Sequence, residues 1–303
     1  MALVRGGFPP VVAPDHPVRP VTNSELAAFE RCPLSWWVEY HHELRAPDEP
    51  GSPAMRGSLV HAMIEAYLDG RKVARVIEAA EAEHAGADWV GDCAALFGSW
   101  ETWWRGVDLG AGVERVEAAV AVPAGGLTHI DGLAGMIDLV IDTGDGHAVI
   151  DHKTSRQPWV VWWPANRAKV ARQLALYAEL AWLAWGYDVR QIGVHHHQFA
   201  ASDRQRARHT EHRWDLTYAA KQQHRLWLTK ALYRLDEAIE TAPPLTRPEA
   251  LARWARPGDH CRYCDFQRGC WQQMIAPGVM ADVSGLVPRG RTQHHATRPL
   301  AAP

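Results

Sequence analysis

The chain has 303 residues, of which 47% are hydrophobic and 22% are charged, as in an ordinary globular protein of one large or two smaller domains. Its formal net charge of −3 excludes a generally basic protein, so any nucleic-acid site must be a local patch. No apolar run reaches membrane-spanning length and no secretory h-region is present, so we expect a cytoplasmic protein that does not contact a membrane.

The sequence pattern predicts an alternation of helices and strands between two unstructured ends. Residues 1–20 are rich in Pro, Gly and Val and are predicted to form a flexible arm, and residues 282–303 a disordered tail. Helices are expected from about Thr22 or Ser24 to Cys32, and over 55–68, 73–84, 92–105, 164–185 and 217–240. Strands are expected over 113–122, on both sides of a turn at 143–146, and over 189–200 and 209–216.

The stretch between residues 138 and 153 is the most informative part of the chain. Two apolar runs flank a Gly/Asp-rich turn at 143–146, which is typical of a β-hairpin. A two-residue loop at 144–145 places Asp138 opposite Asp151, whereas a loop one residue later places Asp138 opposite Lys153. In either register the three side chains share one face, and opposed Cβ atoms lie roughly 4.5–5.5 Å apart. The hairpin therefore indicates half of a cation site.

Two predicted helices carry polar residues four positions apart, which places them on one helix face. Gly57, His61 and Glu65 follow one another in this way on the first helix. Gly57 costs helix stability, so we expect another element to approach it closely. Gln173 and Tyr177 have the same spacing on the later helix and are either an interfacial pair or part of a site.

Cysteine spacing favours metal binding over a disulfide framework. Cys261, Cys264 and Cys270 are close in the sequence, and Cys32 stands near the other end of the chain. Zinc, a disulfide or chance could each explain the Cys261-x-x-Cys264 pair alone. Cys93 has no partner in this scheme and is predicted to be a buried thiol.

Two further stretches have both a structural and a functional interpretation. Trp159, Trp162 and Trp163 are expected in a loop, where they either pack or stack on bases of single strands. The Arg204–Arg213 region contains four arginines and forms either a solvated surface or a phosphate contact.

The order of these motifs resembles the RecB-like branch of the PD-(D/E)xK nuclease superfamily over residues 22–275. The matching motifs are Gly57-x-x-x-His61-x-x-x-Glu65, Gly135-Met136-Ile137-Asp138, Ile150-Asp151-His152-Lys153-Thr154 and Gln173-x-x-x-Tyr177. Cys32 with Cys261-x-x-Cys264-x5-Cys270 narrows the resemblance to iron–sulfur members. These include the CRISPR-associated RecB-like exonucleases and the AddB-type nuclease domains.

The resemblance implies an α/β fold with a central mixed sheet flanked by helices and a helical cap that bears a four-cysteine cluster. The nuclease domain would cover residues 21–281, with the cap built from about 22–45 and 243–275. A [4Fe–4S] cluster would be bound by the four cysteines, Cys32, Cys261, Cys264 and Cys270, and would tie the first helix to the last segment.

The resemblance also assigns roles at the hairpin. Asp138, Asp151 and His61 would bind Mg²⁺ or Mn²⁺, with the His152 carbonyl as a further ligand. Lys153 would orient or deprotonate the attacking water and compensate charge on the phosphate. Gln173 and Tyr177 would position the site or the nucleic acid, and Glu65 would support His61 or contact the metal indirectly.

The expected function is a metal-dependent DNA exonuclease that prefers single-stranded ends and acts in recombination, CRISPR adaptation or phage DNA metabolism. Partners would be DNA and a helicase or CRISPR adaptation proteins, while the oligomeric state stays open. One alternative is a catalytically weak DNA-binding adaptor with a structural four-cysteine metal site. Another is a zinc-stapled interaction module.

Overall fold

The computed structural model describes residues 20–47, 49–107, 112–200, 207–241, 254–267, 270 and 287–288. The chain forms two compact units, each from separated segments. One unit takes residues 1–47, 121–135 and 225–303, and the other takes residues 48–120 and 136–224. Nearly all of the predicted arm and tail lies outside the described residues. The exception in the tail is β8 (Val287–Pro288), which pairs antiparallel with β2 (Leu44–Arg45).

The second unit contains the mixed sheet that the sequence predicts. Its central strand, β5 (His147–Ser155), pairs antiparallel with β4 (Gly132–Asp142) and parallel with β6 (Val189–Gln198). β7 (Arg208–Asp215) lies antiparallel beside β6. β3 (Val113–Pro123) also pairs with β4. In the first unit, β1 (Val21–Thr22) pairs in parallel with the start of β4, so the strand order is β1-β4-β5-β6-β7.

The hairpin between β4 and β5 adopts the first of the two predicted registers. Leu139 pairs with Ile150, and the turn is closed by the Thr143 amide, which donates to the Gly146 carbonyl at 2.9 Å. The two-residue loop places Gly144 in the left-handed region with φ 79°, where a glycine is favoured. One step beyond Leu139 and Ile150, this register sets Asp138 opposite Asp151.

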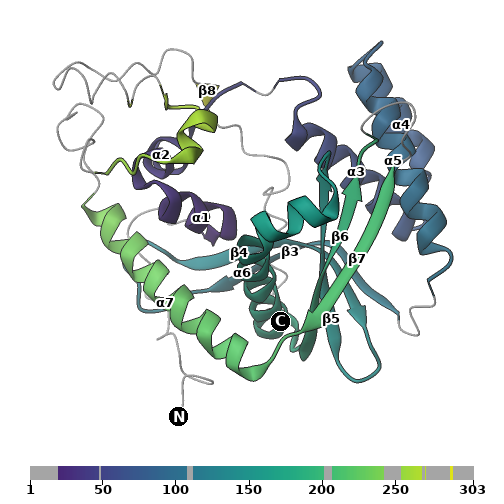
Figure 1. Ribbon diagram of the computed structural model, residues 1–303. Coiled ribbons are helices and arrows are strands. Elements are labelled where there is room, and N and C mark those ends of the chain that lie inside the picture. Colours follow the sequence, from purple (N-terminus) through teal and green to yellow (C-terminus); the bar gives the residue numbers. More distant parts are fainter. Residues whose placement is uncertain are drawn as a thin grey trace. The chain divides into compact units, whose positions relative to one another are not determined.

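Helices cover both faces of the sheet in the second unit (Figure 1). On one face lie α3 (Pro53–Leu68) and α5 (Asp88–Trp104), with α4 (Val73–Glu83) packed against them. On the other lies α6 (Trp159–Trp185). The ring centroids of Trp100 on α5 and His152 on β5 lie 6.2 Å apart. The next side chain back along β5, Asp151, points to the opposite face and accepts a hydrogen bond from Gln173 of α6. Strands covered on both sides explain why Val140 and Val149 are as fully buried as Leu139.

The core between α3 and α5 is apolar and includes Met63, Ile64, Leu96 and Trp100. Cys93 is fully buried in it, as predicted, and its thiol donates to the Arg56 carbonyl at 3.6 Å. Burial raises the pKa of this thiol to about 12, so it is unreactive at neutral pH.

The start of α6 differs from the prediction, which placed a tryptophan loop before a helix beginning at Pro164. The helix begins at Trp159, with Pro158 as its N-cap residue, and Pro164 lies inside it. The amide of Trp162 donates to the Pro158 carbonyl at 2.9 Å. A helical turn is therefore already closed before Pro164, the residue that was expected to start the helix. The other end is as predicted, because Gly186 adopts φ 73° as the C-cap.

The first unit is built on short helices near its N-terminus. α1 (Asn23–Arg31) begins at the predicted cap, since Thr22 accepts a bond from the Glu25 amide at 3.2 Å. α2 (Pro33–Trp36) and a π-helix (Trp37–His41) follow. The buried Glu25 carboxylate accepts a 3.0 Å bond from the Trp36 indole, which stabilises a charge in this apolar core.

Further along the chain the first unit contains the later part of α7 (Tyr218–Glu240) and a 3-10 helix at Asp259–Tyr263. The Trp227 indole of α7 donates to Glu30 at 2.7 Å and so ties α7 to α1. Among the described helices, none combines the length and the apolar character that crossing a bilayer requires.

Candidate active site and cysteine pocket

Five elements of the second unit deliver polar side chains to one place. Asp138 lies on β4 and Asp151 on β5, while His61 comes from α3 and Gln173 from α6. The fifth contributor is Glu117 on β3, which no motif in the sequence singled out. All five are helices or strands, which hold side chains in more defined positions than loops do.

Three of these residues form a compact ligand group. One ligand atom from each of His61, Glu117 and Asp138 lies within 4.8 Å of the others, and no other such group occurs in the described part of the chain. His61 Nδ1 lies 2.9 Å from Glu117 Oε1 and 3.7 Å from Asp138 Oδ2. The carbonyl oxygen of His152 lies 3.1 Å from His61 Nε2, so the predicted backbone ligand is also close.

Glu117 was missed because the strand run Val113–Val122 contains Glu114 as well, and nothing in the spacing distinguishes the two. In the structure Glu117 has φ 43°, in the left-handed region that non-glycine residues rarely adopt. Such backbone conformations cluster at functional sites. The carboxylate reaches His61, whereas Glu114 is exposed and lies near the Tyr187 hydroxyl.

The electrostatics of the ligand group favour a bound cation. Burial raises the pKa of Asp138, and the neighbouring Glu117 raises it further despite His61. Burial lowers the pKa of His61, but Asp138 and then Glu117 outweigh burial and raise it to about 9. Two carboxylates, an imidazole and a carbonyl are a suitable ligand set for Mg²⁺ or Mn²⁺. A divalent cation would neutralise the buried negative charge.

Asp151 stands beside this group and makes different contacts. Its carboxylate forms an ion pair with Lys153 at 2.7 Å and accepts a 3.1 Å bond from the Gln173 amide. Burial raises the pKa of Asp151 to about 6, although Lys153 opposes the shift. Gln173 also donates to the Tyr177 hydroxyl at 2.9 Å. The predicted pair on α6 therefore lies at the site and fixes the Asp151 carboxylate.

Lys153 is held protonated at neutral pH. Burial lowers the pKa of its ammonium, but Asp151 and Asp138 outweigh burial and raise the pKa above its usual value. A protonated lysine next to the ligand group stabilises negative charge and does not accept a proton.

The two other residues of the α3 motif have different fates. A Cβ on Gly57 would lie 3.2 Å from Thr154 Oγ1, which confirms the close approach expected at this glycine. Glu65 does not support His61, contrary to the prediction. Its carboxylate pairs with Arg71 at 2.9 Å, because Arg71 follows directly after the end of α3.

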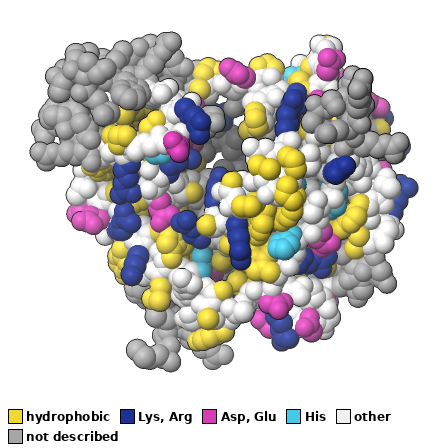
Figure 2. Space-filling view, in the orientation of Figure 1, with side chains coloured by type: hydrophobic (Ala, Val, Ile, Leu, Met, Phe, Trp, Pro, Cys, Tyr) yellow, Lys and Arg dark blue, Asp and Glu magenta, His cyan; other side chains and the backbone are white. Residues whose placement is uncertain are grey.

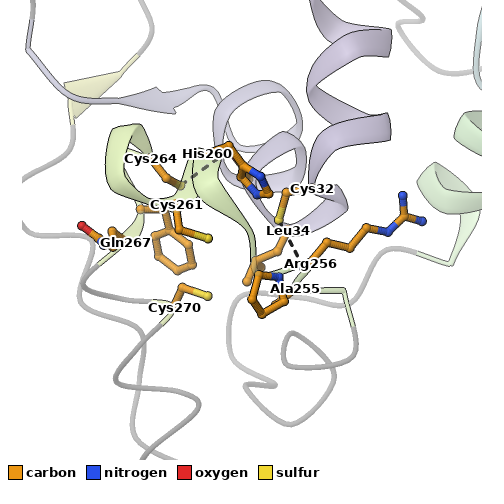
Figure 3. Close-up of a pocket in the computed structure, with 12 residues that line it drawn as sticks. Cys32, Leu34, Ala255, Arg256, His260, Cys261, Cys264, Gln267 and Cys270 are labelled. Atoms are coloured by element: carbon orange, nitrogen blue, oxygen red, sulfur yellow. Dashed lines mark hydrogen bonds between the residues drawn. The ribbon is translucent and has the colours of Figure 1, made fainter.

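The four predicted cysteine ligands line one pocket in the first unit (Figure 3). Cys32 comes from the junction of α1 and α2, and Cys261, Cys264 and Cys270 come from the 3-10 helix and the residues after it. Leu34, Ala255, Pro257 and Phe266 supply apolar walls. Segments more than 220 residues apart in sequence thus meet, as in the Arg256 amide that donates to Cys32 Sγ at 3.5 Å.

The thiols of this pocket influence one another. Burial raises the pKa of Cys270 to about 11, and Cys32, Cys264 and Cys261 add to the shift. The Gly258 amide donates to Cys261 Sγ at 3.3 Å, a contact that stabilises a thiolate. No three cysteine sulfurs among the described residues lie within 4.8 Å of one another.

The remaining candidates lie in the second unit. Trp159, Trp162 and Trp163 are in contact on the first turns of α6. Arg204 and Arg206 lie outside the described residues. Arg213 forms an ion pair with Glu211, which indicates a solvated strand surface at that position.

Comparison with known proteins gives a family. The profile of the PD-(D/E)XK nuclease superfamily matches residues 20–271. No curated protein matches the sequence. Among solved structures, SSO0001 has 16% identity and a TM-score of 0.40, with 85% of each chain covered. A protein of Eubacterium rectale named "Putative exonuclease" has 12% identity and a TM-score of 0.47, with 73% of this chain and 81% of that chain covered. Because the family profile spans most of its length, the chain belongs to the PD-(D/E)XK nuclease superfamily.

Proposed function

We propose that the protein is a divalent-metal-dependent DNA exonuclease that acts on single-stranded ends. The observation that carries the proposal is the compact group of His61, Glu117 and Asp138 beside the Asp151–Lys153 ion pair. Membership of the nuclease superfamily supports phosphodiester hydrolysis as the reaction.

The residues around the site divide the work. A divalent cation would supply positive charge to the phosphate and increase the acidity of a bound water. Lys153 would contribute a second positive charge next to the scissile phosphate. Gln173 would hold the Asp151 carboxylate in place against Lys153, and Tyr177 would fix the Gln173 amide.

The proposal is tested with end-labelled linear, end-blocked and circular single strands in Mg²⁺ or Mn²⁺. The expected result is shortening of the linear strand from a free end, with blocked and circular strands intact. Asp151→Ala and Lys153→Ala should lose this activity and keep the wild-type fold, as judged by circular dichroism, although loss of one partner of a buried ion pair lowers the melting temperature. A protein that cleaves none of these strands with either metal would contradict the proposal and favour a DNA-binding adaptor.

For the cysteine pocket we propose a [4Fe–4S] cluster, as in the iron–sulfur branch of RecB-like nucleases. The support is the four thiols around one apolar pocket and the amides of Gly258 and Arg256 directed at their sulfurs. A single tetrahedral zinc ion would bring the thiolates to about 3.8 Å from one another, given Zn–S bonds of about 2.3 Å. No three sulfurs of the described cysteines lie within 4.8 Å of one another, so the pocket does not hold them at the spacing of a single zinc ion.

Anaerobic purification followed by iron, sulfide and zinc analysis tests the cluster. We expect four irons and four sulfides per chain, and their loss in Cys32→Ser but not in Cys93→Ser. A colourless protein with one zinc ion would contradict the cluster and leave the nuclease proposal untouched.

Recombination, CRISPR adaptation and phage DNA metabolism are the settings we propose, with a helicase or CRISPR adaptation proteins as partners.

A further inference from the structure

Five aromatic rings continue the sheet face that carries Asp151 and Lys153. Strand register sets Asp151 beside Val194 on β6, and Val194 beside His212 on β7. Side chains of partners in register share a face, so His212 lies two strands from Asp151, about 10 Å away. The rings of this face, here called the aromatic platform, are Trp159, Trp162 and Trp163 of α6 and His212 and Trp214 of β7.

The rings of the platform form a chain of contacts, each ring against the next. Trp159 stacks on Trp163 with ring centroids 4.8 Å apart and an interplanar angle of 15°. Trp163 in turn lies 5.2 Å from His212 and 5.3 Å from Trp214. On the side of the catalytic residues, Trp162 lies 4.8 Å from the His196 ring, and His196 is the register partner of Lys153. The platform is therefore continuous with the site.

Unlike the tryptophans of the core, most of the platform meets solvent. Trp36, Trp37 and Trp100 are fully buried elsewhere in the chain. In the platform only Trp162 is buried, and His212 is exposed. The adjoining Val160 and Val161 are 76% and 54% exposed, and Figure 2 shows apolar side chains gathered over the first turns of α6. An exposed apolar surface of this kind marks a binding site.

From the end of β5 into α6, the charged side chains near the platform are of one sign. Residues 152–178 contain no Asp or Glu, and they contain five basic residues, which are Lys153, Arg156, Arg167, Lys169 and Arg172. All of these except Lys153 are exposed. Lys and Arg side chains appear beside the apolar surface in Figure 2. On β7, Glu211 and Asp215 flank His212 and Trp214, and Glu211 is paired with Arg213. Aromatic faces beside a stretch whose charges are all basic suit a ligand with flat rings and a negative backbone, which is a single nucleic-acid strand.

We propose that Trp159, Trp163 and Trp214 stack on the bases of the single strand whose phosphate lies at Asp151 and Lys153. This inference rests on the proposed function, because it assigns the binding surface for the same substrate. Stacking on a base face does not depend on base identity, so the platform confers preference for unpaired strands and none for sequence. Bases within a duplex are covered by their neighbours and would not engage it.

The platform is tested by the binding of two fluorescein-labelled strands of equal length. Binding is measured by fluorescence anisotropy in EDTA, so that the strands are not cleaved. One strand carries thymine at every position and the other is abasic. Trp163→Ala and Trp214→Ala should each weaken binding of the thymine strand about fivefold or more. They should leave the weaker binding of the abasic strand unchanged. Trp163→Phe, which keeps a stacking ring, should restore most of the affinity.

Trp185→Ala is the matched control, because Trp185 lies half-buried at the other end of the same helix. Equal affinity of wild type and both alanine variants for both strands, in a protein that cleaves single strands, would overturn the platform and leave the nuclease intact. A wild-type chain that neither binds nor cleaves any strand would overturn both. In that case a concentration-dependent mass that falls in Trp163→Ala would show that the surface binds another copy of the chain.

Discussion

At the scale of single residues, Asp138 shows why we propose a bound cation at the site. The residue is 6% exposed and lies next to a second carboxylate, Glu117, so burial and repulsion both disfavour its charge. A protonated His61 partly compensates this charge, but a ring nitrogen that carries a proton cannot bind a metal ion. Binding of a divalent ion would therefore displace the proton from His61 and supply a larger positive charge.

Glu117 provides the first residue-scale prediction. Glu117→Gln removes one negative ligand from the group and should weaken Mn²⁺ binding at least about tenfold, with a matching rise in the metal concentration needed for cleavage. Isothermal titration with Mn²⁺ measures the affinity directly. The control is Glu114→Gln on the same strand, which is exposed. Equal Mn²⁺ affinity in the two variants would remove Glu117 from the ligand set.

The second prediction at the residue scale concerns Gly57. Gly57→Ala places a Cβ 3.2 Å from Thr154 Oγ1, so the threonine side chain must shift by a few tenths of an ångström or α3, which carries His61, must move away from β5, which carries Lys153. Alanine gains roughly 1 kcal/mol of helix propensity, so we expect the free energy of unfolding to change little while cleavage slows. Adding Thr154→Ala relieves the contact and should restore the rate. Full activity in Gly57→Ala alone would show that the close approach is unimportant.

At the scale of elements, the hairpin was predictable and the ends of α6 only in part. A tight turn fixes the register of both strands, so the sequence limited the partner of Asp138 to Asp151 or Lys153, and the register of the structure selects Asp151. Gly186 likewise marked where α6 ends. Its start was misplaced because the rule that favours proline in a first turn was applied to Pro164, and the apolar Trp162 is buried one turn earlier. Glu117 could not be found, since β3 offered two acidic residues and no turn to fix its register.

The histidines of β6 and β7 were also not predicted, and they make the sheet sensitive to acid. His196 and His209 have pKa values lowered to about 4 and about 3, in both cases chiefly by burial. Both values lie below the unfolded value of about 6.5, so the unfolded chain binds more protons as the pH falls. Stability from these groups is complete above about pH 6.5 and is lost as the pH falls from there towards their folded pKa values.

We therefore expect the free energy of unfolding in urea to fall between pH 6.5 and pH 4.5. Each of these histidines contributes up to about 1.4 kcal/mol per pH unit in this range. His209→Gln, which cannot titrate, should have a shallower slope than the wild type. His212 lies exposed on the same strand, so His212→Gln is the control. An unchanged slope in His209→Gln would show that the ring is not buried uncharged.

At the scale of the whole molecule, the chain brings together residues from distant parts of the sequence twice, once in each unit. Cys32 meets Cys261, Cys264 and Cys270 around one pocket, and α3 meets the β4–β5 hairpin at the ligand group. The first could be anticipated because cysteines are few and chemically distinctive. The second was anticipated for His61 by its helical spacing. The tryptophans of α6 were singled out as packing or base-stacking residues, but the rest of the aromatic platform was not predicted. Strand register sets His212 and Trp214 beside Trp163, and the sequence alone does not give that register.

A cation held by His61, Glu117 and Asp138 would promote hydrolysis of a phosphodiester, and this role is tested by the metal dependence of cleavage. Cleavage of a labelled single strand is followed against Mn²⁺ concentration for the wild type, Asp138→Asn and Asp142→Asn. Asp142 lies on the same strand outside the ligand group, and an asparagine keeps the oxygen that accepts the Gly144 amide. We predict saturable Mn²⁺-dependent cleavage by the wild type and Asp142→Asn, and none by Asp138→Asn. Equal cleavage by Asp138→Asn and the wild type would contradict the account.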